Sequence, residues 1–176
     1  LAHIWRWGEN MGLHQVGSPG GAVALPDDGG PLSYTVAAAQ GPVRLRYIAP
    51  PDHLRAYFGS LYLFSVSADH YTDITRADSP QLRIMLSGAG EYHFQDGAVV
   101  PTPDLCLLGP TSGATRFALN GPARVLGVSL LPAGWVSLHD QDASRLADRL
   151  RDLTEDRGGA FAAVRDRLRD MDDGDA

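Results

Sequence analysis

The segment from residue 81 to residue 131 consists of short apolar runs at regular intervals. The runs are QLRIML, EYHF, AVV, LCLL, ATRFAL and ARVLGVSLL, and they are separated by SGAG, QDG, PTPD, GPTSG and NGP. Asp96-Gly97 and Asn120-Gly121 favour hairpin turns, because these residue types tolerate a positive φ. Strands of this length and spacing are typical of an antiparallel sandwich or barrel.

The flanking segments divide the chain into three parts. Residues 1–42 are rich in Gly and Pro and predict a loosely structured arm with one or two edge strands, and residues 43–131 predict the β-barrel core, in which residues 67–80 form a loop. Residues 132–176 predict amphipathic helices, one of them over residues 142–158 with Asp142 as its N-cap. We therefore expect one mainly β domain, a jelly-roll barrel or sandwich followed by C-terminal helices.

Composition excludes several classes of function. All 15 basic residues are Arg, and the absence of Lys excludes P-loop, Schiff-base and pyridoxal-phosphate chemistry. The net charge of −6 gives no broad basic surface for DNA. The single cysteine, Cys106, has no partner for an internal disulfide and favours the cytoplasm. No apolar window approaches the ~18 residues of a membrane span.

A possible metal site is suggested by Glu91, His93 and Gln95, which alternate along one run and share one face of a strand. A cupin-type metal centre needs about three converging ligands, and the hairpin over residues 110–119 contains no histidine. The chain also lacks H-E-x-x-H and G-x-S-x-G motifs. We therefore expect no metal, no cofactor and no enzymatic activity, with a metal-dependent cupin-type enzyme as the alternative.

Alternation along the strands places aromatic, Met and Arg side chains on shared faces, as in a small-molecule pocket. Packing in the core would explain the same pattern. The predicted ligand-binding residues are Tyr62, Phe64, Arg83, Met85, Tyr92, Phe94 and Arg116. The apolar stripes of the C-terminal segment predict a homodimer contact. It comprises Leu146, Leu150, Leu153, Phe161, Val164 and Leu168.

The segment LCLLGPTSGATRFALNGPARVLGVSLLPAGWVSL, followed by SRLADRLRDLTEDRG, resembles the N-terminal domain of AraC-type transcription regulators. Gly109-Pro110 matches a turn of that family, and residues 127–134 match its strand exit. APPDHLRAYFGSLYLFSV resembles the opening segment, so that the likeness runs from about Tyr47 to Gly159. It implies a cupin-like barrel that binds an effector or mediates dimerisation, and a DNA-binding domain that this chain lacks.

The leading hypothesis is thus the effector-binding and dimerisation domain of a cytoplasmic AraC-type regulator. Its partners would be an unknown small molecule, a second copy of the chain, and DNA through the missing domain, with no membrane. Ligand binding would favour one arrangement of barrel, arm and helices. The alternatives are the metal-dependent enzyme and a stand-alone small-molecule-binding barrel.

Overall fold

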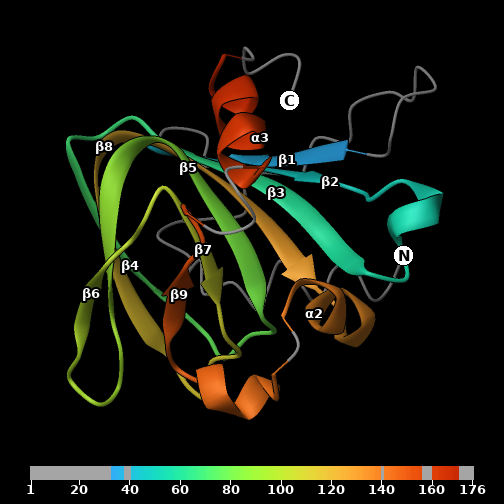
Figure 1. Cartoon of the computed structure of the whole chain (residues 1–176). Helices are drawn as coiled ribbons and strands as arrows, with labels where there is room; N and C mark the ends of the chain where they lie inside the picture. Colours follow the sequence, from blue (N-terminus) through green and yellow to red (C-terminus); the bar gives the residue numbers. More distant parts are fainter. Residues whose placement is uncertain (1–32, 38–40, 140, 156–159, 171–176) are drawn as a thin grey trace.

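The computed structural model of this chain describes residues 33–37, 41–139, 141–155 and 160–170. Its elements follow in chain order: β1 (Ser33–Ala37), β2 (Val43–Ile48), η1 (Asp52–Leu54), β3 (Phe58–Val66), β4 (His70–Thr75), β5 (Gln81–His93), β6 (Val99–Pro101), β7 (Leu105–Leu108), β8 (Thr115–Leu130), α2 (Pro132–Leu138), η2 (Ala143–Leu146), β9 (Leu150–Asp152) and α3 (Ala160–Arg169). The expected mainly β architecture with C-terminal helices is confirmed (Figure 1).

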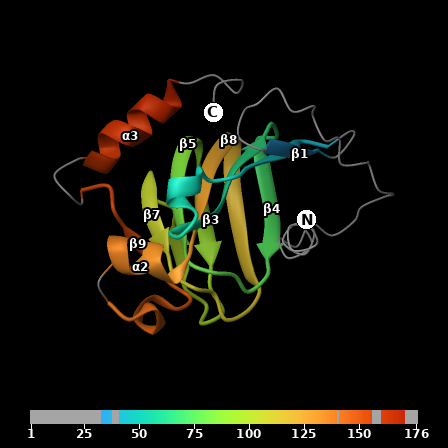
Figure 2. The ribbon, with the colours of Figure 1, turned by 90° about the vertical axis from the view of Figure 1, so that its right-hand side faces the viewer.

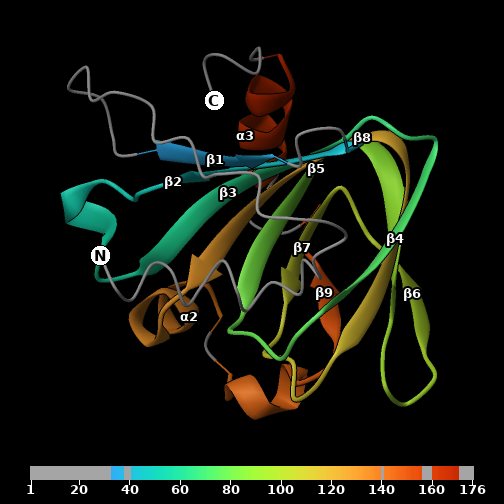
Figure 3. The same ribbon diagram turned by 180° about the vertical axis from the view of Figure 1, so that it is seen from behind.

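Two layers of antiparallel strands share the long strands β5 and β8. The larger layer has the order β1-β2-β3-β8-β5-β7-β9, while β4 pairs with β8 and β6 pairs with β5 to form the smaller layer. Seen from behind, β4 and β6 lie on the side of the molecule away from β1 and β2 (Figure 3). Because β5 and β8 pass from one layer into the other, the sheet curves around an interior as in a cupin-like jelly roll.

The curvature arises where we predicted turns. SGAG lies inside β5, where the register with β8 shifts between Met85 and Ala89 and Gly88 has a φ of 80°. The predicted hairpin at Asn120-Gly121 is wrong, because β8 runs continuously through this dipeptide. Each of these segments bends a long strand instead of ending it. The turn at Asp96-Gly97 is confirmed, with a φ of 86° at Gly97.

Residues 67–80, predicted as a loop, contain strand β4, which pairs with the first half of β8 from His70↔Asn120 to Thr75↔Thr115. Its residues alternate between exposed and half-buried, and Tyr71, Asp73 and Thr75 are the half-buried ones. The sequence HYTDIT has few apolar residues, so period-two hydrophobicity is weak there. The missed strand forms one wall of the interior described below.

Both faces of the larger layer are buried. On the face away from the interior, a leucine-rich cluster that includes Leu63, Leu82, Ile84 and Leu126 packs beneath Trp135 of α2. Helix α3 contacts β5 and β7 (Figure 2). The C-terminal segment therefore covers the outer face of the sheet that forms the barrel.

The helix predicted over residues 142–158 is wrong in its secondary structure. Asp142 does cap a helix, since its side chain accepts a hydrogen bond from the Ser144 backbone N–H, but that helix is the short η2. Asp148 then takes a left-handed conformation with φ 53°, and β9 pairs with β7. The leucines of this segment pack against the core, and the free edge of β7 selects a strand for part of it. Within the described residues, no helix is both long and apolar enough to cross a membrane.

Candidate ligand-binding cavity

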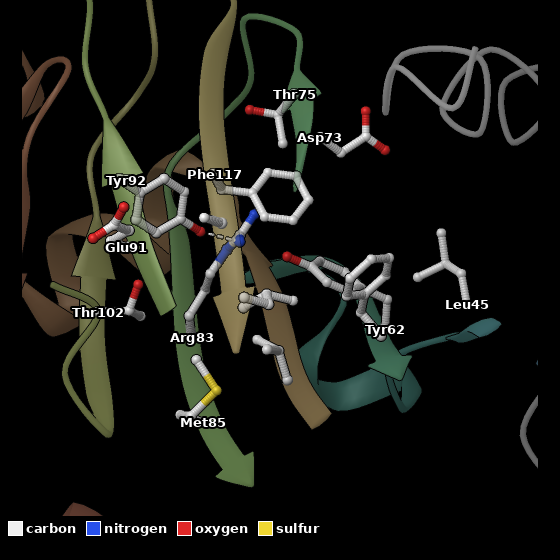
Figure 4. Close-up of a pocket in the computed structure, with 14 residues that line it drawn as sticks. Leu45, Tyr62, Asp73, Thr75, Arg83, Met85, Glu91, Tyr92, Thr102 and Phe117 are labelled. Carbon is white, nitrogen blue, oxygen red and sulfur yellow. Dashed lines mark hydrogen bonds between the residues drawn. The ribbon is translucent and has the colours of Figure 1, made fainter. Parts of the chain in front are cut away.

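A cavity lies between the two layers and is partly open to solvent (Figure 4). The centres of water molecules can occupy about 40 Å³ of the cavity volume. The larger layer lines it with Leu45, Tyr62, Phe64, Arg83, Met85 and Val125, and the smaller layer with Asp73, Thr75, Glu91, Tyr92, Phe117, Ala118 and Leu119, together with Thr102. The walls are mainly apolar, as is common for small-molecule sites.

Arg83 is the cation among the residues that line the cavity. It reaches the cavity because residues alternate along β5, with Leu82 and Ile84 in the outer core and Arg83 facing inward. Its guanidinium carbon lies 5.9 Å from the ring centroid of Tyr62 and 5.3 Å from that of Tyr92. Two aromatic rings, one on β3 and one on β5, therefore stabilise the cation.

A hydrogen-bonded chain fixes the orientation of Arg83. Its Nε donates to Gln81 Oε1 at 3.0 Å, and its Nη1 donates to the Tyr92 hydroxyl. The same Gln81 oxygen accepts the Tyr62 hydroxyl at 2.6 Å, while Gln81 Nε2 donates to Asp78 Oδ2 at 2.5 Å. Gln81 is only 1% exposed, so the hydrogen bonds at the centre of this network are shielded from water.

Burial changes the acid strength of several groups in this network. It raises the pKa of Tyr62 to about 12 and also raises that of Tyr92, so both phenols stay protonated. It raises the pKa of Asp78 as well, and the hydrogen bonds from Ser79 and Gln81 and the charge of Arg83 oppose that shift. Cys106, the register partner of Arg83 on β7, has its thiol pKa raised to about 12 by burial, which fits an inert thiol.

Gly127 makes room for the Tyr62 ring. The two residues are register partners on β3 and β8, and a Cβ at Gly127 would lie 2.0 Å from Tyr62 Cζ. The ring therefore lies across the backbone of β8, and its hydroxyl points to Gln81. A side chain at Gly127 would displace Tyr62 and, with it, the cation it covers.

The wall formed by β4 adds a second polar group. The Tyr71 hydroxyl donates to Asp73 Oδ2 at 2.6 Å, and burial together with this bond raises the pKa of Tyr71. The Tyr71 ring also packs against Phe64 and Phe117 in an aromatic cluster. Asp73 and Thr75 thus line the cavity across from Arg83 (Figure 4).

The structure brings together most of the residues that the sequence predicts for ligand binding. Tyr62, Phe64, Arg83, Met85 and Tyr92 all line the cavity. Two others lie elsewhere. Phe94 stacks on Tyr92 with 5.9 Å between ring centroids and packs against Leu108 and Leu150. Arg116 lies on the exposed face of β8, and Phe117 takes the inward position. Their role in binding ligand stays a prediction.

On the face that carries Glu91 and His93, these two side chains are hydrogen-bonded to each other. His93 Nε2 lies 2.8 Å from Glu91 Oε1, and both side chains are partly exposed. Gln95 lies apart from them, with its Nε2 3.5 Å from the Ala114 carbonyl oxygen. In the part of the chain that the structure describes, no group of three His, Cys, Asp or Glu side chains is placed to hold a metal ion.

The residues predicted for dimerisation divide between core and surface. Leu153 belongs to the outer core at 5% exposure, and Leu146 and Leu168 pack against that core. Leu150 packs against the Tyr92 and Phe94 cluster, and Val164 on α3 is 51% exposed. Phe161 lies in α3, and its side chain is outside the described part. Leu153 thus packs within its own subunit, and the subunit contact stays a prediction.

Several cavity residues escaped the sequence reasoning. Asp73 and Thr75 line the cavity from β4, which the sequence did not predict, and Gln81 and Asp78 belong to the network that orients Arg83. A signal for Gln81 existed: it stands two positions before Arg83, and therefore on the same face of the strand, where a buried guanidinium needs an acceptor. Nothing in the sequence indicated Asp78.

No known family model matches the chain, and no curated protein matches its sequence. Solved structures similar in backbone include the AraC-like transcriptional activator CuxR, with 12% identity, a TM-score of 0.42 and coverage of 80% of this chain and 60% of CuxR. The nucleoside dehydratase Pac13 of Streptomyces has 16% identity, a TM-score of 0.36 and coverage of 54% and 75%. Oxalate decarboxylase of B. subtilis has 7% identity, a TM-score of 0.38 and coverage of 68% and 36%.

These likenesses concern the cupin-like fold. The chain spans 60% of CuxR and 36% of the oxalate decarboxylase. Two of the three similar structures are enzymes by name, a dehydratase and a decarboxylase. The prediction that this chain is not an enzyme is therefore corrected, because missing sequence motifs do not decide the question for a fold that enzymes share.

Proposed function

We propose that this chain is a small-molecule-binding domain that acts as the sensor of an AraC-type transcription regulator. The observation that carries the proposal is the cavity itself, with mainly apolar walls and one oriented cation, Arg83. The resemblance supports the regulatory part. Its strand-exit segment forms the end of β8 and the start of α2, and its Gly127 is the residue that seats Tyr62.

A direct connection joins the cavity wall to the C-terminal helix α3. The side chain of Met85 lines the cavity, and its backbone carbonyl accepts a hydrogen bond of 3.0 Å from Arg169 Nη2. The Met85 backbone N–H donates to the Asp104 carbonyl, and the Asp104 carboxylate pairs with Arg165 at 3.0 Å and with Arg169 at 3.1 Å. α3 is thus fastened to the strand that forms the cavity.

This connection suggests how a ligand would act. Met85 stands at the irregular point of β5, where the register shifts before Ser87. A ligand that moves Met85 would change the acceptor that holds Arg169 and so favour one of two positions of α3. In the regulators that the sequence resembles, helices of this segment lead to the DNA-binding half, so a shift of α3 would re-space two such halves in a dimer.

Ligand binding at the cavity is tested with a matched pair of variants on β4. Thr75 faces the cavity and Thr72 faces solvent. A thermal-shift screen of metabolite-sized compounds should find molecules that raise the melting temperature of the wild type and of Thr72→Tyr, but not of Thr75→Tyr. Compounds that stabilise all three proteins equally would bind elsewhere and contradict the proposal, and so would a screen without a stabilising compound.

The subunit contact is tested on the exposed side of α3. Among the predicted dimer residues whose side chains are described, Val164 is the one that is largely exposed. If two copies meet through α3, Val164→Glu should shift the chain from dimer to folded monomer in sedimentation velocity. A variant that sediments as the wild-type dimer, or a wild type that is monomeric at high concentration, would contradict this contact.

A further inference from the structure

We propose that the ligand of this cavity is a small monocarboxylate with a compact apolar body, bound through Arg83 and the Tyr92 hydroxyl. This inference rests on the proposed ligand-binding function and adds the chemical class of the ligand. Four observations lead to it: the incomplete pairing of Arg83, the hydroxyl hydrogen of Tyr92, the character of the walls and the size of the space.

The charge of Arg83 is left without a counter-ion in the described part of the chain. A guanidinium carries five N–H donors. Two of them are engaged, by Gln81 and by Tyr92, and three remain. Asp78, the acid that influences Arg83, is already engaged by the Ser79 backbone N–H at 2.7 Å and by Gln81 at 2.5 Å. A largely buried cation of this kind favours an anion that completes its pairing.

Tyr92 supplies a second donor beside the first. Its hydroxyl oxygen accepts from Arg83, and the hydroxyl hydrogen has no acceptor among the described residues. The Tyr62 hydroxyl differs, because it donates its hydrogen to Gln81 Oε1. Arg83 and Tyr92 thus present N–H and O–H donors at one point of the cavity, which suits the two oxygens of a carboxylate.

The rest of the cavity lining determines which chemical groups the remainder of the ligand can carry. Phe64, Met85, Phe117 and Val125 surround the same space with apolar surface. The space open to water centres, about 40 Å³, corresponds to roughly three water positions. A carboxylate with a short or branched hydrocarbon chain fills such a space, while a nucleotide exceeds it. The lining also contains polar side chains away from the apolar group, namely Asp73, Thr75, Glu91 and Thr102.

The test compares pairs of compounds that differ in charge and share a shape. The wild type is titrated calorimetrically with propanoate and 3-methylbutanoate and with the corresponding amides. The difference in affinity within each pair gives the contribution of the carboxylate charge to binding. The acids should bind at least about 10-fold more tightly than their amides, as expected when a charge-assisted hydrogen bond is replaced by a neutral one. This comparison needs no variant, so it holds whatever the stability of an Arg83 substitution.

Two arginine variants locate the site. Arg83→Gln should lose the preference for the acid over the amide, and Arg116→Gln, on the exposed face of β8, should keep it. Amides that bind as tightly as acids, a preference that survives Arg83→Gln, or a wild type that binds none of the acids would each overturn the inference. In those cases, neutral compounds that Thr75→Tyr excludes would still establish the cavity as a binding site, so the two proposals fail separately.

Discussion

Replacing Gly127 by alanine would place a methyl group against the ring of Tyr62. The added Cβ would lie 2.0 Å from Cζ and 2.3 Å from the hydroxyl oxygen, whereas ordinary contact begins at 3.4 Å. The ring must therefore move by about 1.4 Å, the difference between 3.4 and 2.0 Å. Overpacking of a core costs about 1–3 kcal/mol. The strained hydrogen bond from Tyr62 to Gln81 adds about 1 kcal/mol.

The free energy of unfolding of Gly127→Ala should accordingly fall by about 2–4 kcal/mol, which lowers the melting temperature by about 5–15 °C for a domain of this size. Gly59→Ala, on the same strand as Tyr62, is the matched control. A Cβ there would meet Ser129 Oγ at 3.4 Å, which is ordinary contact, so that stability should change by less than about 0.5 kcal/mol.

A double-mutant cycle assigns the cost to one contact. In a Tyr62→Ala background the ring is gone, so Gly127→Ala should cost at least about 1.5 kcal/mol less than in the wild type. Chemical denaturation monitored by circular dichroism provides all four free energies. Equal effects of Gly127→Ala in both backgrounds, or a Gly127→Ala protein as stable as Gly59→Ala, would refute the argument that Tyr62 is seated on Gly127.

Three further predictions concern groups around the cavity and α3. Burial raises the pKa of Asp78, so its ionised form costs stability at neutral pH. As the pH rises from about 4 to 7, urea titrations should show Asp78→Asn gaining stability relative to the wild type; a constant difference would contradict this. Asp148→Asn, which tolerates the left-handed φ of 53°, should behave in the opposite sense, because hydrogen bonds from Ser112 lower the Asp148 pKa. Its destabilisation should be present at pH 7 and shrink as the pH falls below about 4, and a loss that does not change with pH would argue against these bonds. Arg169→Gln should remove the bond to the Met85 carbonyl, so amide hydrogen exchange in α3 should speed up several-fold while exchange in β3 stays unchanged; equal exchange in α3 would show that this bond does not hold the helix.

The sequence predicts most reliably where apolar alternation is strong. In QLRIML, period two puts Arg83 and Met85 on one face and Leu82 and Ile84 on the other, and the structure has this arrangement. The same reasoning fails for HYTDIT, because a strand that borders a polar part of the cavity carries Asp73 where alternation would require an apolar residue. Long-range pairing with β8 makes β4 a strand, and pairing over that distance leaves no local signal.

Turn residues mislead in the long strands. Asn120-Gly121 satisfies the preferences of a tight turn. However, β8 pairs with β4 before this point and with β3 after it, so the dipeptide lies at a bend within one strand. The leucines after Asp142 fit one face of a helix equally well as they fit η2 and β9. The free edge of β7 decides between these structures, and an edge exists only in the folded sheet.

The central claim, that the cavity around Arg83 is a ligand-binding site, is tested most directly through Met85. The chain contains three methionines, of which Met85 lines the cavity, so a spectrum of protein labelled with ¹³C at the methionine methyl groups is simple, and Met85→Leu assigns the signal. Titration with 3-methylbutanoate should shift the Met85 methyl signal progressively to saturation in the wild type and leave it in place in Thr75→Tyr. A Met85 signal that stays fixed in the wild type while the compound binds would contradict the account, because the ligand would then occupy another part of the molecule.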